Sequence, residues 1–87
     1  MLLRTNQSMN DEMPTLGQSR VRVSFNPGQN EAVQSIKQKA AELIDLCESL
    51  KDAYNGSPNE KNRCLAVAQT EIESAAMWAV KGATFTV

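Results

Sequence analysis

The residues best suited to chemistry in this chain lie just before and within its first predicted long helix. Phe25 and Asn26 stand directly before a turn, and Lys37 and Lys39 follow further along the helix. A phenylalanine ring can stack on a nucleobase, and an asparagine amide can read a base edge or hold a phosphate. A lysine ammonium suits a phosphate as a point charge, and the guanidinium of Arg22 could reach one as well. This set indicates a binding site for a ligand that carries bases and phosphates.

Each of these residues also has a purely structural interpretation. Phe25 could anchor the preceding segment in the core, as buried aromatic residues do. Lys37 and Lys39 could be ordinary exposed helix lysines, and Arg20 and Arg22 could form a solvated face. Both interpretations stay open on the sequence alone.

No constellation typical of catalysis or of a metal centre stands out in this chain. The chain has no histidine, so a Cys–His nucleophile is excluded, and a zinc site on Cys47 and Cys64 would need carboxylates to complete it. There is no glycine-rich phosphate loop and no nucleophile elbow. Glu71 and Glu73 stand two positions apart on a predicted helix, face different ways and fit a solvated face. We expect a binding protein and not an enzyme, with no metal, no cofactor and two reduced cysteines.

Length and charge limit the class of protein further. With 87 residues the chain has room for one domain, and its net charge of -1 speaks against a binder of nucleic acid polymers. No apolar run approaches the roughly 18 residues of a membrane span. The first five residues are too few and too polar for a signal peptide. We therefore expect a cytoplasmic protein without a membrane partner.

The order of predicted elements gives a mainly α chain. Residues 1–19 have little periodicity and predict a flexible leader, so the domain is expected over residues 20–87. Residues 20–25 alternate apolar and polar side chains, which predicts a short strand or extended arm. After a turn, Asn30 is expected to cap a helix that ends near Lys51. Turn residues then lead to a second helix from about Asn59 to about Lys81, followed by a β-prone tail.

Both predicted helices carry apolar residues at three-four spacing, which is typical of a packing seam. The first seam is Val33, Ile36, Ala40, Leu43, Cys47, Leu50 and Tyr54, and the second is Leu65, Ala68, Ile72, Ala75, Ala79 and Gly82. The short loop between them predicts an antiparallel helical hairpin. Ile44, Leu46, Met77, Trp78 and Val80 lie off these seams as further apolar flanks. Because two helices bury little surface, we expect the hairpin and its arm to assemble as a homo-oligomer.

Segments of both helices resemble a known family. Residues 36–44 are similar to the first-helix motif of the phage cyclic-oligonucleotide sponges, which counter the CBASS and Thoeris bacterial defences. Residues 65–72 and 76–83 are similar to the second-helix motif, so the resemblance spans about residues 25–83. It implies a compact homo-oligomer, typically a hexamer, with ligand pockets between subunits. It also implies sequestration of the messenger without cleavage, in the cytoplasm of an infected bacterial host.

The resemblance also implies roles for individual residues. Phe25 and Asn26 match the aromatic–asparagine pair of the cyclic dinucleotide pocket, Lys37 matches its lysine, and Lys39 matches a polar residue two positions on. The separate cyclic trinucleotide pocket uses an arginine–threonine pair, where this chain has Gln69-Thr70. Loss of that arginine removes a bidentate phosphate donor, which favours a cyclic dinucleotide over a trinucleotide. The arm at residues 20–25 could reshape the pocket toward a cyclic ADP-ribose isomer.

Three other functions remain open. The hairpin could be an oligomeric helical interaction module with no nucleotide ligand, and would then need no role for Lys37. It could bind nucleic acid through Arg20, Arg22 and the two lysines, against which the net charge speaks. It could also degrade the messenger, which turnover would reveal.

Overall fold

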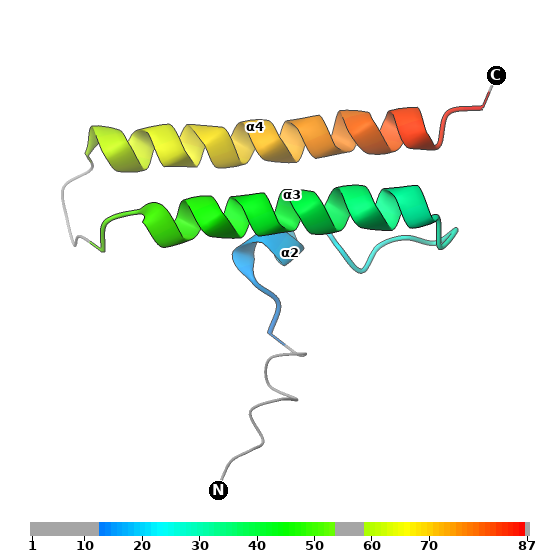
Figure 1. The fold of residues 1–87 in the computed structure, drawn as a ribbon, viewed down its shortest axis with the longest axis horizontal. Coiled ribbons are helices and arrows are strands. Elements are labelled where there is room, and N and C mark those ends of the chain that lie inside the picture. Colours follow the sequence, from blue (N-terminus) through cyan, green and yellow to red (C-terminus); the bar gives the residue numbers. More distant parts are fainter. Residues whose placement is uncertain (1–12, 54–58, 87) are drawn as a thin grey trace, which may run out of the picture.

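Three helices make up the described part of the chain in the computed structural model, which describes residues 13–53 and 59–86. They are α2 (Leu16–Val21), α3 (Glu31–Leu50) and α4 (Glu60–Ala83). Figure 1 shows α3 and α4 side by side, with the short α2 against α3. The prediction of a mainly helical chain built around a hairpin is confirmed.

The two long helices begin where asparagine side chains cap them. The Asn30 side chain accepts a hydrogen bond from the Val33 backbone N–H at 3.0 Å, and Asn59 accepts one from Asn62 at 2.7 Å. Such caps satisfy backbone donors that have no partner inside the helix. Glu31 and Glu60 follow in the first turns, where the helix dipole favours a negative charge. Local sequence therefore sets both helix starts.

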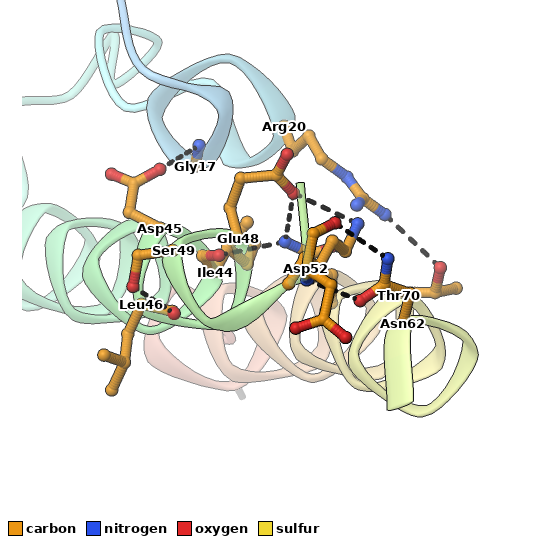
Figure 2. A network of polar contacts seen from close by, with 12 residues as sticks. Gly17, Arg20, Ile44, Asp45, Leu46, Glu48, Ser49, Asp52, Asn62 and Thr70 are labelled. Atoms are coloured by element: carbon orange, nitrogen blue, oxygen red, sulfur yellow. Dashed lines mark hydrogen bonds and ion pairs between the residues drawn. The ribbon is translucent and has the colours of Figure 1, made fainter. Parts of the chain in front are cut away.

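Contacts between α3 and α4 run along most of their length. The Gln69 side chain donates to the Ile44 carbonyl at 3.0 Å in the middle of the pair. Near the end of α3 and the start of α4, the Asp52 backbone N–H donates to the Asn62 side chain at 2.9 Å. Figure 2 shows this second contact among the polar contacts around Arg20. The apolar core between the elements consists of Val21, Ala41, Ile44 and Ala76, with Val23, Ile36, Ala40 and Ile72 packed against it.

The predicted seam of α3 is rotated in the structure. Leu43 and Leu50, placed on the seam, are 47% and 51% exposed, whereas Ile44, placed off it, is fully buried. The reason is that α3 has two neighbours, since α2 and α4 both pack against it. The buried stripe is therefore Val33, Lys37, Ala41, Ile44 and Cys47. Tyr54 and most of the predicted loop lie outside the described residues.

The predicted strand at residues 20–25 is wrong. Arg20 and Val21 end α2, Arg22 has a left-handed φ of 55°, and the Phe25 N–H donates to the Arg22 carbonyl at 2.8 Å. A capping box between Thr15 and Gln18 starts this helix. Val21 at the end of α2 and Val23 in the turn after it both pack at the apolar core, which accounts for the alternating pattern without a strand. α2 begins at Leu16, within the residues that were predicted to form a flexible leader. The start of the domain at residue 20 stays a prediction.

Two polar links fasten α2 to the hairpin. The Gly17 N–H donates to Asp45 of α3 at 2.7 Å, as Figure 2 shows. The Arg20 guanidinium binds Glu73 of α4 at 2.8 Å. These links fix the segment that follows α2, which carries Arg22 and Phe25. None of the three helices that the structure describes combines the length and the hydrophobicity of a membrane-spanning segment.

Substitution of Gly17 tests how closely α2 must approach α3. A β-carbon at Gly17 would lie 2.1 Å from the Ala41 carbonyl oxygen, a backbone atom that cannot move aside cheaply. We expect Gly17→Ala to lower the free energy of unfolding by about 1–3 kcal/mol, as overpacking typically does. Thermal unfolding measures this loss. Gly28→Ala is the matched control, because nothing lies within 4 Å of its added β-carbon; equal melting of the two variants would contradict the close packing of α2.

Candidate ligand-binding site

A pocket of about 340 Å³ opens between the end of α2, the start of α3 and the second half of α4. Its charged lining side chains are Arg20, Arg22, Lys37 and Glu73, and Phe25 and Met77 are among the apolar ones. Three cations and one carboxylate give this lining a net charge of +2. Its size lies at the lower end of the roughly 300–1,000 Å³ typical of ligand sites. The fold thus brings three of the predicted site residues, Arg22, Phe25 and Lys37, to one cavity.

Two cationic side chains flank the Phe25 ring in this pocket. It is 51% exposed and lies outside the apolar core. The Arg22 guanidinium carbon lies 4.3 Å from the ring centroid, and the Lys37 ammonium lies 5.3 Å from it. Both distances are within the range of cation–π attraction. The ring is therefore held by cations while much of its surface stays open to a ligand.

Lys37 is buried and holds the turn before α3. Only 8% of the residue is exposed, so it is not an ordinary solvated lysine. Its ammonium donates to the Arg22 carbonyl at 3.1 Å and to the Phe25 carbonyl. Burial, followed by the nearby Arg22 charge, lowers the pKa of Lys37 below its usual range. An ammonium has three N–H donors, so two bonds to the backbone leave one for a ligand.

Asn26 and Lys39 do not join this pocket within one chain. The Asn26 side chain donates to the Asn30 carbonyl at 2.9 Å and accepts from the Asn30 N–H at 3.2 Å. It lines a separate hollow with Gln34. Lys39 is exposed, and its place two residues after Lys37 turns it to another side of α3.

Gln69 and Thr70 make different contacts within the chain. Gln69 is 1% exposed, and its amide donates to the Ile44 carbonyl and to the Glu48 carboxylate, both at 3.0 Å. The bond from Gln69 is the main cause that lowers the pKa of Glu48, with Lys51 contributing next. Thr70 is exposed, and its hydroxyl accepts from Arg20 at 3.4 Å, as Figure 2 shows. Gln69 therefore joins the helices, and Thr70 belongs to the links of α2.

Two charged lining residues were missing from the sequence-based site. Arg20 was assigned to an arm and Glu73 to a solvated face, yet Arg20 Nε lies 2.8 Å from Glu73 Oε1 at the pocket. The sequence does contain a signal that could have identified Glu73 as a pocket residue. Its spacing from Met77 and Val80 places all three on one face of α4. That face was overlooked because its first residue is charged.

The role of Gln69 between the helices can be tested by truncation. Gln69→Ala removes two hydrogen bonds and leaves buried space, so we expect a loss of about 1–3 kcal/mol in the free energy of unfolding. Chemical denaturation measures it. Gln38→Ala is the control because Gln38 is an exposed glutamine on α3. A Gln69→Ala variant as stable as this control would contradict the buried role.

Comparison with known proteins gives one match. The model of the Acb2/Tad1 hairpin domain matches residues 17–84, a span from the start of α2 to the C-cap of α4. The comparisons with curated proteins and with solved structures gave no match.

Among the described residues, no group of three or more histidine, cysteine, aspartate or glutamate side chains is placed to hold a metal ion.

Proposed function

Because this chain belongs to the Acb2/Tad1 hairpin-domain family of phage cyclic-oligonucleotide sponges, which counter CBASS and Thoeris defences, we propose that it sequesters a cyclic dinucleotide without cleaving it. Sequestration of cyclic oligonucleotides is the activity of the family. The choice of a dinucleotide rests on one observation, the pocket with a net lining charge of +2 around the exposed Phe25 ring. Two phosphodiesters carry two negative charges, so charge and ring together fit this ligand.

The proposed contacts follow from the chemistry of the pocket residues. Phe25 stacks on one base, a contact that tolerates any base identity. The Arg22 guanidinium and the remaining N–H of Lys37 face the phosphates. Gln69 is buried and its amide already donates a hydrogen bond to the Ile44 carbonyl, which disfavours the trinucleotide pocket at Gln69-Thr70. A cyclic ADP-ribose isomer carries a pyrophosphate of similar charge and is the second ligand class to test.

We propose that the pocket is completed in a homo-oligomer, with a hexamer as the expected form. The Cα atoms of the chain span only 13 Å in the thinnest direction, so its apolar residues cannot all be enclosed. Large apolar side chains remain exposed, namely Leu43, Leu46, Leu50, Val67, Met77, Trp78 and Phe85. Exposed apolar surface of this extent is typical of subunit contacts. Asn26 and Lys39 would then contact ligand from a neighbouring subunit.

The proposed mechanism is mass action in the cytoplasm of an infected bacterial host. Each bound messenger is removed from solution, so the free concentration stays below the threshold of its effector. A symmetric oligomer offers several equivalent pockets per particle. If a pocket lies between subunits, ligand binding also stabilises the assembly.

Recovery of the ligand tests sequestration against degradation. The purified protein is incubated with a cyclic dinucleotide, the free ligand is removed, and the complex is denatured by heat. We expect chromatography to return the cyclic dinucleotide intact and in stoichiometric amount. A linear or monomeric product would show an enzyme. A protein that retains no ligand would favour the alternative function, an oligomeric helical interaction module. The exposed leucines of α3 support that alternative.

A further inference from the structure

The pocket contains a carboxylate that a binder of phosphates does not need. Glu73 lines the same cavity as Arg22, Phe25 and Lys37. A carboxylate repels the phosphates of a cyclic dinucleotide, and solvent screens the 36% exposed Glu73 side chain only in part. Beyond its ion pair with Arg20, this carboxylate therefore favours a part of the ligand that carries hydrogen-bond donors.

The carboxylate of Glu73 is held in place and is only partly used. Its Oε1 atom accepts from Arg20 Nε at 2.8 Å, and Arg20 is itself held by Thr70 at 3.4 Å. Oε2 accepts no hydrogen bond from the described residues. An ionised carboxylate offers about four acceptor positions, so most of them remain for a ligand. Arg20 acts here as a positioning residue, because its hydrogen bond to Oε1 orients the carboxylate.

Guanine is the base that fits such a group best. Its Watson–Crick edge presents two neighbouring donors, the N1–H and the exocyclic amine, and a carboxylate can accept both. The corresponding edge of adenine presents its exocyclic amine beside an acceptor nitrogen. The acceptor nitrogen of adenine would face the negative charge. A base stacked on Phe25 can turn its edge toward α4, where Glu73 stands.

We propose that Glu73 reads guanine and makes guanine-containing cyclic dinucleotides the preferred ligands of this site. The inference rests on the proposed function, because it assigns a selectivity to the same pocket. Stacking on Phe25 and the phosphate contacts do not select a base, because Phe25 accepts the face of any base. The inference adds a selective residue, Glu73, and the base that it selects, guanine. Selectivity and affinity are therefore separable in the experiment.

The test compares cyclic di-GMP and cyclic di-AMP by calorimetry on the assembled protein. We expect the wild-type protein to bind cyclic di-GMP about tenfold or more tightly than cyclic di-AMP, as a good bidentate base contact provides. Glu73→Gln should reduce this ratio to near one, mainly by weakening cyclic di-GMP, because an amide offers one acceptor and one donor. Its amide oxygen can still accept from Arg20, so helix content and oligomeric state should stay unchanged.

Glu71→Gln is the matched control, since Glu71 is an exposed glutamate on the same helix and outside the pocket lining. It should keep the wild-type ratio. A wild-type protein that binds both ligands equally, or a Glu73→Gln variant that keeps the preference, would overturn the inference while the proposed function stands. If Glu73→Gln raised the affinity for both ligands by the same factor, the carboxylate would act only by repelling phosphates. That result would also overturn the proposed guanine selectivity. A wild-type protein that binds neither ligand, nor any other cyclic nucleotide, would overturn both.

Discussion

A Phe25→Ala variant is expected to lose between about fivefold and 150-fold in affinity for a cyclic dinucleotide. Stacking of one base on an aromatic side chain contributes about 1–3 kcal/mol, which corresponds to this range. The loss should come without unfolding, because Phe25 is 51% exposed and lies outside the core. Calorimetry gives the affinity, and circular dichroism shows whether the helices remain.

Phe85→Ala is the matched control for this prediction. Phe85 is also an exposed phenylalanine, at 65%, but it follows the C-cap of α4 and does not line the pocket. The control should bind as the wild-type protein does. Wild-type affinity in Phe25→Ala would remove the ring from the site, and an equal loss in both variants would point to a nonspecific effect.

A Trp78→Asp variant is expected to dissociate the proposed homo-oligomer into monomers. Trp78 is 67% exposed in the single chain, and the Lys81 ammonium lies 5.0 Å from the centroid of its ring. In an oligomer this surface would be buried, and an aspartate there would leave a charge without a partner. The single chain should keep its helices, because the substitution removes no core residue. Native mass spectrometry measures the change in stoichiometry.

Trp78→Phe is the conservative control. It keeps an aromatic contact without adding a charge, so it should stay assembled. If Trp78→Asp remains fully assembled, Trp78 does not lie between subunits. If both variants dissociate, the indole ring itself is required and the charge is not the cause.

The long helices could be predicted because their signals are local. Asn30 and Asn59 stand at the starts of α3 and α4, and apolar periodicity marks the rest. α2 was missed because six residues carry too little periodicity to define a helix. Its formation depends on the capping box at Thr15 and on the close approach of Gly17 to Ala41, which is a contact across the fold.

The candidate site could be predicted only in part for the same physical reason. Phe25 and Lys37 were found from their chemical types and from the family resemblance, and both line the pocket. The burial of Lys37 and its bonds to backbone carbonyls depend on where α2 ends, which periodicity does not encode. Gln69 was expected at a ligand, yet its amide joins α4 to α3. Glu73 was assigned to solvent because a charged residue on a helix usually faces it.

The most direct test of the central claim is native mass spectrometry of the purified protein with a cyclic dinucleotide, its linear form and a cyclic ADP-ribose isomer. Sequestration of a cyclic dinucleotide predicts a homo-oligomer, a hexamer in the expected case, that gains intact cyclic dinucleotide and binds the linear form more weakly. An oligomer that takes up none of the cyclic ligands, or that binds the linear dinucleotide equally well, would contradict it.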